Sequence, residues 1–294
     1  SNIVCRVANM VSSDQRNRIG YAVFDTDINE LRGIEAANPF VTCIQTSTNL
    51  SVGESLNIDE HARNEWFPMN QILDSKTLTE GAGQVRATSR LAFEMAVRAG
   101  LMDKLHFAIE NLYKVESTNT EQALRVVIVS SLAGGTGSGL IVPVALYIRN
   151  FLKTRFQQSA NIMRGFFLMP EIFFEVIRGQ TERNNLMCNA YATIRELDAF
   201  LMKGDGTLNE KYMTSVKLDF PRVGTDTYDE YMVRPYDFCF LFDAQNTAGR
   251  KLNNFAQYIE HAANCIYSQS IGPMNKRSNS SEDNTIRDLC AQRG

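Results

Sequence analysis

Short apolar runs along this chain alternate with longer segments in which apolar residues recur every three or four positions. The short runs predict strands, and the longer segments predict amphipathic helices. Strands are expected at 21–24, 126–130, 165–169 and 238–242, and helices at 3–10, 88–99, 102–113, 140–151, 184–201 and 252–269. Residues 45–78 are polar and aperiodic, which indicates a long surface loop or insertion. The alternation predicts an α/β fold with a doubly wound, mostly parallel sheet flanked by helices.

One predicted strand runs directly into a cluster of glycines. The apolar run 126–130 suits a strand buried on both faces of a parallel sheet, and the stretch SSLAGGTGSGLIV begins at its last residue, Ser130. A strand that enters a glycine loop and then a helix presents backbone N–H groups above the carboxyl edge of the sheet. Pro143 fits the first turn of that helix, where no intrahelical N–H bond is lost. The expected ligand is a phosphate chain, held by Ala133, Gly134, Gly135, Thr136, Gly137 and Ser138.

The same glycines have a simpler explanation, in which they form a tight turn with close helix packing and no ligand. Four glycines interleaved with Thr136 and Ser138 favour phosphate binding over that alternative. Two common phosphate loops are excluded. No lysine follows Gly139 in a G-x-x-x-x-G-K-[ST] pattern, and no G-x-G-x-x-G follows a predicted strand.

Composition narrows the function classes further. A net charge of -3 over 294 residues gives no general basis for binding nucleic acid. The six cysteines are dispersed without a C-x-x-C pair, as is typical of reduced thiols in a cytosolic protein. No apolar stretch reaches the ~18 residues of a membrane span, and no export signal begins the chain. We therefore expect a cytoplasmic protein that contacts neither nucleic acid nor a membrane directly.

The segment AGGTGSG, Ala133 to Gly139, resembles the G-G-G-T-G-[ST]-G signature of the tubulin and FtsZ superfamily of GTPases, with Ala133 in place of the first glycine. Other segments resemble parts of that family in the same order. They are YAVFDTD (21–27), EGAGQ (80–84), ERNNLMCNAYATIREL (182–197) and FAQYIEHAANCI (255–266). The resemblance implies a tubulin/FtsZ-type GTP-binding domain over residues 1–270.

Members of this family begin with a strand and a glycine loop around the α and β phosphates. This sequence starts where such a loop would end, so that Asn2 is the one residue expected to reach the nucleotide from it. The resemblance thus implies a domain that lacks its first strand and first glycine loop here. Residues 271–294 are expected to be a polar segment that leads toward a missing or truncated second domain.

The same resemblance implies that the chain binds GTP or GDP together with Mg²⁺, with no direct protein ligand to the metal. Asp25 and Asp27 would assist Mg²⁺ through water molecules, since magnesium retains much of its hydration. Alternatively, these two aspartates cap the turn that follows them. Arg86 and Arg90, near a helix start, either screen phosphate charge or are simply solvated.

Further nucleotide contacts are implied by the matching segments. Glu182 would accept a ribose hydroxyl, although a carboxylate at a helix start also stabilises the macrodipole without a ligand. Asn185 and Asn189 lie four apart on one helix face, where their amides either read a purine edge or bond to backbone. Asn264 matches the asparagine with which the central helix of the family holds the base. Backbone donors to the terminal phosphates are expected from Gly81, Ala82 and Gly83, with an ordinary helix entry as the alternative.

By resemblance, copies of the protein assemble head to tail into protofilaments, and one subunit completes the hydrolytic site of the next. Adaptor proteins are not indicated. The resemblance implies hydrolysis of GTP at subunit contacts, but no catalytic carboxylate is recognisable after the last predicted helix and none is assigned. A non-hydrolysing nucleotide-binding scaffold or filament protein is the alternative, and an unrelated α/β enzyme with another phosphorylated substrate is a third possibility.

Overall fold

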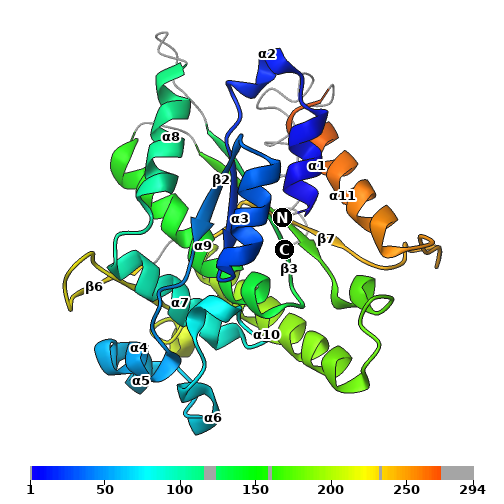
Figure 1. The fold of residues 1–294 in the computed structure, drawn as a ribbon. Helices are drawn as coiled ribbons and strands as arrows, with labels where there is room; N and C mark the ends of the chain where they lie inside the picture. Colours follow the sequence, from blue (N-terminus) through cyan, green and yellow to red (C-terminus); the bar gives the residue numbers. More distant parts are fainter. Residues whose placement is uncertain (1, 116–123, 158–160, 232–233, 273–294) are drawn as a thin grey trace.

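A computed structural model of the chain describes residues 2–115, 124–157, 161–231 and 234–272 (Figure 1). Its central sheet is parallel, with strand order β3-β4-β7, and consists of β3 (Arg125–Ser131), β4 (Ile162–Leu168) and β7 (Phe238–Phe242). A second parallel pair is formed by β1 (Tyr21–Asp25) and β2 (Val41–Gln45). The α/β class and the mostly parallel sheet that the sequence predicts are therefore confirmed.

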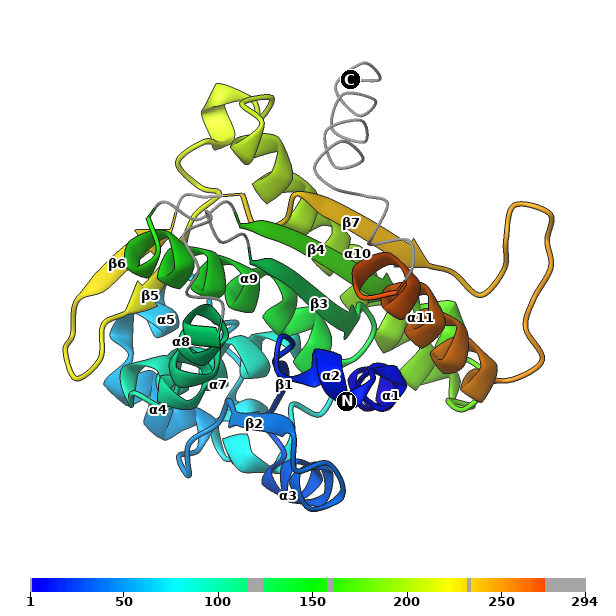
Figure 2. The ribbon, with the colours of Figure 1, turned by 90° about the horizontal axis from the view of Figure 1, so that it is seen from above.

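Helices cover both faces of the central sheet (Figure 2). On one face lies a core built from α9 (Gly135–Arg155) with α7 (Arg86–Arg98), α8 (Asp103–Val115) and α10 (Gln180–Gly204). On the other face, α1 (Asn2–Met10) and α11 (Phe255–Ser270) form a second core. Alternate residues of β3 point to the two sides, because side chains in a strand alternate between faces. Val126 and Ile128 pack in the first core, and Val127 and Val129 in the second.

Strand β1 lies in the same layer as the central sheet. Ala22 and Phe24 pack against the α9 core, whereas Tyr21 packs against the α1–α11 core. Among the described residues, however, β1 pairs with β2 alone and β3 pairs with β4 alone. Two open strand edges thus remain in one layer. On the outer side, α3 (Ile28–Ala37) packs on β1 and β2 through Leu31, and the short α2 (Ser13–Arg16) precedes β1.

The expectation of a loop at 45–78 is wrong. This insertion contains α4 (Val52–Ile58), α5 (Glu60–Glu65), α6 (Gln71–Asp74) and the 3-10 turn η1 (Leu78–Glu80). A capping box starts α4, because Ser51 Oγ accepts from the Glu54 amide and the Glu54 carboxylate accepts from the Ser51 amide. These helices bury their own apolar residues against α7. They are too short to show a helical period in the sequence.

Two further expectations are corrected. Strand 126–130 is half-buried rather than fully buried, in agreement with the open edge of β3. Pro143 lies well inside α9 rather than in its first turn, because the helix already begins at Gly135. An antiparallel hairpin of β5 (Leu218–Pro221) and β6 (Tyr228–Tyr231), which the sequence analysis did not assign, follows α10 and the 3-10 turn η3 (Glu210–Tyr212). The polar segment expected at 271–294 lies almost wholly outside the described residues.

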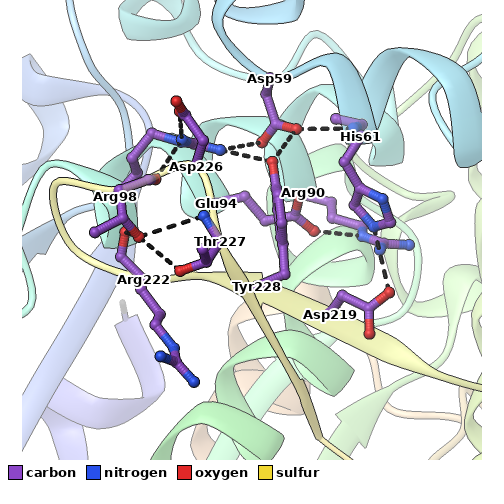
Figure 3. A network of polar contacts seen from close by, with 12 residues as sticks. Asp59, His61, Arg90, Glu94, Arg98, Asp219, Arg222, Asp226, Thr227 and Tyr228 are labelled. Atoms are coloured by element: carbon purple, nitrogen blue, oxygen red, sulfur yellow. Dashed lines mark hydrogen bonds and ion pairs between the residues drawn. The ribbon is translucent and has the colours of Figure 1, made fainter.

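A buried polar network joins α7 to the insertion and to the β5–β6 hairpin (Figure 3). Arg98 Nη2 donates to the Tyr228 hydroxyl at 2.6 Å and lies 3.6 Å from Asp59 Oδ2. The Tyr228 hydroxyl in turn donates to Asp59 Oδ1 at 2.6 Å. Asp59 is fully buried and also caps α5. This network fixes the end of α7 that is remote from the glycine loop.

Candidate functional site

The glycine loop connects β3 to α9 at the carboxyl edge of the sheet. Gly134 is the N-cap, with φ -77° and ψ 161°, and has no side chain to cap the helix. The amides of Gly135, Thr136 and Gly137 lie in the first turn, where no intrahelical acceptor exists. Within the described part of the chain they make no other hydrogen bond. Three N–H donors and the positive end of a 21-residue helix are thus available to an anion.

Other donors expected from the same loop are already used. The Ala133 amide donates to Ser131 Oγ at 3.0 Å. The Ser138 amide donates to the Gly134 carbonyl at 3.1 Å, and the buried Ser138 hydroxyl donates to the same carbonyl. Ala133 and Ser138 therefore shape the loop in this structure rather than offering donors to a ligand.

Close packing accounts for three of the glycines. A Cβ at Gly135 would lie 2.9 Å from atoms of Ala82, Gln84 and Val85, and one at Gly137 would lie 2.7 Å from the Ser131 carbonyl oxygen. A Cβ at Gly139 would lie 2.5 Å from the Arg86 carbonyl oxygen. At Gly134, by contrast, a Cβ would meet no atom within 4 Å. The packing explanation therefore holds for Gly135, Gly137 and Gly139, and Gly134 alone borders open space.

A second loop, residues 81–84, lies directly against the first. Gly81, Gly83 and Gln84 all have positive φ, at 83°, 53° and 63°. Gln84 is the one non-glycine residue with positive φ among the described residues. The loop ends where the Val85 amide donates to the Ala82 carbonyl at 3.0 Å and α7 begins. Lys76, which the sequence analysis overlooked, places its ammonium group against Gly83.

Helix α10 runs beside both loops. Asn189 Nδ2 donates to the Gln84 carbonyl at 2.9 Å and to the Ala133 carbonyl at 3.0 Å. Asn185 is exposed, and its Nδ2 lies 3.4 Å from Gln84 Oε1. Of the two alternatives for Asn189, the structure thus shows the bond to backbone. Glu182 is exposed in the first turn of α10, where its charge favours the helix dipole.

The two aspartates after β1 have different surroundings. Asp27 is the N-cap of α3, and its side chain accepts from the amides of Asn29 at 2.8 Å and Glu30 at 3.2 Å. Asp25 Oδ1 accepts from the Asp27 amide at 3.1 Å. Burial raises the pKa of the Asp25 carboxyl, and this hydrogen bond opposes the rise. Capping therefore describes Asp27, whereas Asp25 is a desolvated carboxylate at the sheet edge that a cation would stabilise.

Two further predicted site residues, Asn2 and Asn264, lie on α1 and α11. Asn2 borders a cavity of about 330 Å³ between these helices, together with Cys5, Arg6, Asn9, Phe255, Ala256 and Ile259. Phe255 stands at the start of α11, and its ring centroid is 5.4 Å from that of Phe173 in the turn η2 (Pro170–Phe173). Asn264 lies farther along α11 on its exposed face. The structure does not bring Asn264 to the glycine loop by any contact among the described residues.

The two arginines near the loops are both paired with carboxylates. Arg86 donates to the Glu196 carboxylate and lies 3.4 Å from the Ser138 carbonyl oxygen. Arg90 Nε donates to Glu94 Oε1 at 2.9 Å, and Arg90 Cζ lies 3.9 Å from the centroid of the Trp66 ring. Sequence spacing pairs Arg90 with Glu94 at i and i+4, whereas the Arg86–Glu196 pair joins α7 to α10 and has no sequence signal.

Taken together, the loops offer backbone donors and helix charge rather than a set of metal ligands. No group of three or more His, Cys, Asp or Glu side chains within the described residues is arranged to hold a metal ion. Among the described helices, none combines the length and apolar character needed to cross a bilayer.

Comparisons with known proteins identify the family of the chain. No curated protein sequence gives a significant match. The solved structure of CetZ from Methanosaeta thermophila strain DSM 6194 is similar over 95% of this chain, with 13% identity and a TM-score of 0.38. This chain spans 52% of that structure, or about half its length. The family described as Tubulin like matches residues 2–293, and the chain therefore belongs to the tubulin-like family.

Proposed function

We propose that this protein binds the phosphate chain of GTP or GDP at the first turn of α9, between the glycine loop and loop 81–84. The observation that carries the proposal is the set of unbonded amides at Gly135, Thr136 and Gly137, beside the open face of Gly134. Backbone donors at a helix start bind phosphate without a lysine. Membership of the tubulin-like family makes a guanine nucleotide the first ligand to test.

Mg²⁺ fits this site as a companion of the phosphates. It prefers oxygen ligands and retains water, and Asp25 offers a desolvated carboxylate at the carboxyl end of β1. Bound there, the ion would neutralise phosphate charge. Asp25 would hold it through water, whereas Asp27 would act through its cap on α3.

The base and ribose would lie toward the starts of α10 and α11. Glu182 and Asn185 are exposed there and retain polar atoms for a ribose or purine. The cavity between α1 and α11, bordered by Asn2 and Phe255, adds an aromatic ring and further polar groups. Asn264 lies on the exposed face of α11, and among the proposed nucleotide-binding residues it has the least support from the structure.

We further propose that copies of the complete protein assemble head to tail in the cytoplasm. The family supports this, and the described cysteines are all unpaired, as expected for a reducing compartment. The open edges of β1 and β3 support an additional strand in this layer of the full-length protein. With a further strand in this layer and a second domain, one copy would contribute residues to the nucleotide site of the next copy.

Titration of the purified full-length protein tests binding. GTP, GDP, ATP and a sugar phosphate are compared with and without Mg²⁺, and we expect micromolar-range affinity for the guanine nucleotides. Gly134→Val introduces a branched side chain into open space next to the amides and is expected to abolish binding. Gly33→Val is the matched control, because a Cβ at Gly33 also meets no atom within 4 Å but lies on α3. Equal affinity of both variants for GTP would refute the site.

Sedimentation and phosphate release then separate the two functional alternatives. GTP-dependent pelleting with release of phosphate supports a GTPase that assembles head to tail. Pelleting without phosphate release supports a non-hydrolysing scaffold. A slowly hydrolysed GTP analogue is the control, because it keeps the protein in its nucleoside-triphosphate-bound state whether or not the protein hydrolyses GTP.

A further inference from the structure

Asn189 is the one side chain of α10 that bonds both loops of the site. Its Nδ2 donates to the carbonyl of Gln84, at 2.9 Å, and to the carbonyl of Ala133, at 3.0 Å. The amide group of asparagine has two hydrogens, and both are therefore committed. The contacts span residues that are 105 and 56 positions away in the sequence.

The carbonyl of Gln84 is held in an unusual place. Gln84 has φ of 63°, a conformation that costs a non-glycine residue energy and persists where neighbouring contacts over-determine it. The bond from Asn189 is such a contact. The other partner, Ala133, is buried and directly precedes the N-cap Gly134.

Asn189 is itself firmly positioned. Its own carbonyl accepts from Thr193 Oγ1 at 2.6 Å. The next residue, Ala190, belongs to the α9 core, and Leu186 one turn earlier is buried as well. The side chain therefore extends from a rigid helix, which is the arrangement that holds flexible loops at a fixed separation.

These contacts leave little capacity for reading a base. Recognition of a purine edge by an asparagine uses a donor together with an acceptor, and Asn189 retains only its Oδ1 acceptor. Asn185, one turn earlier, is exposed and makes a single 3.4 Å contact with the Gln84 side chain. Asn189 therefore bonds to the backbone of both loops, whereas the polar atoms of Asn185 remain accessible to a ligand.

We propose that Asn189 is a positioning residue that clamps loop 81–84 to the glycine loop and so sets the width of the phosphate site. The expected effect on ligand binding rests on the proposed function. The contact between the two loops does not, because it is present without a ligand. Loss of the clamp lets the loops separate, which weakens every ligand with a phosphate chain, whatever its base.

Hydrogen exchange without any ligand tests the clamp directly. The amides of Val85 and Ser138 close the two loops by bonds of 3.0 and 3.1 Å, and their exchange rates report loop opening. We expect Asn189→Ala to raise both rates about tenfold, and the isosteric Asn189→Asp, which removes both donors, to do the same. Asn184→Ala, an exposed position on the same helix, is the matched control. Unchanged rates in both Asn189 variants would overturn the proposal.

Binding of GTP, ATP and inorganic triphosphate then separates a clamp from a base contact. With a clamp, Asn189→Ala weakens GTP and inorganic triphosphate by a similar factor of about ten, and the preference for GTP over ATP stays the same. Loss of GTP affinity with unchanged triphosphate affinity would instead assign Asn189 to the base and overturn the proposal. If the wild-type protein binds none of these ligands, the proposed function fails, and the exchange rates alone decide whether Asn189 couples the loops.

Discussion

Gly135 and Gln84 belong to loops far apart in the sequence, yet a Cβ at Gly135 would lie 2.9 Å from Gln84 Cα. Such proximity leaves no room for a side chain, because two of the three nearest atoms, Gln84 Cα and Val85 N, are backbone and the third is the Ala82 Cβ. The glycine is therefore required by packing, whether or not a nucleotide binds.

Replacement of Gly135 should accordingly be costly in the free protein. Gly135→Ala is expected to lower the free energy of unfolding by about 1–3 kcal/mol through overpacking. Gly134→Ala, with open space around its Cβ, is expected to cost less than about 1 kcal/mol. Urea unfolding measures the loss in free energy for each variant, provided that the m-value is the same as that of the wild-type protein. Equal losses for the two variants would contradict the close approach of the loops.

A pH dependence of stability is expected from Glu94. Burial raises the pKa of its carboxyl from 4.5 to about 7, opposed by Arg90 and assisted by Asp59 and Asp219. Between these values the folded protein holds a proton that the unfolded chain has lost, so stability falls as the pH rises from 4.5 to 7. Above pH 7 both states are ionised and the penalty, roughly 3 kcal/mol, is constant.

Glu94→Gln mimics the protonated carboxyl and keeps an acceptor for Arg90. Near pH 4.5 the variant is expected to have the same free energy of unfolding as the wild-type protein, because the wild-type carboxyl is protonated in the folded state. At pH 8 the variant is expected to be the more stable of the two. Unfolding by urea at both pH values measures the difference. A constant offset between the two proteins across this range would argue against a raised pKa.

The cap at the start of α3 should be independent of metal and nucleotide. Asp27→Ala removes two hydrogen bonds to first-turn amides and is expected to cost about 1 kcal/mol in the presence of EDTA. Asp27→Asn retains an acceptor and should restore most of the loss. Thermal unfolding of the three proteins gives the comparison. If Asp27→Ala lowered stability only in the presence of Mg²⁺ and GTP, and not in EDTA, Asp27 would be assigned to the metal instead.

The ion pair between Arg86 and Glu196 should stabilise the nucleotide-free protein. Arg86→Ala leaves a partly buried carboxylate without its partner and is expected to cost about 1.5–3 kcal/mol. Glu196→Gln still accepts a hydrogen bond and should cost less. Chemical unfolding without nucleotide measures both effects. A loss of nucleotide affinity at unchanged stability would instead support phosphate screening by Arg86.

Long periodic segments were predictable because their pattern is local. The strand at 238–242 and the helices α7, α8 and α10 follow from apolar spacing, and the break at 133–139 follows from glycine content. The insertion helices were missed because helices of four to seven residues complete at most two turns. The Ser51–Glu54 capping box was a signal that marks the start of α4 in the sequence.

The sequence by itself determined the α/β class, the position of the glycine loop and the resemblance to tubulin-like proteins, because these depend on residue types and on spacings within one element. Tertiary structure alone decided the partners of the polar side chains. Asn189 bonds two loops, Arg86 pairs with Glu196, and Gly135 and Gly139 are packed against residues 82–89. Such contacts join elements 50 or more residues apart, and local propensity contains no information about which distant atoms will meet.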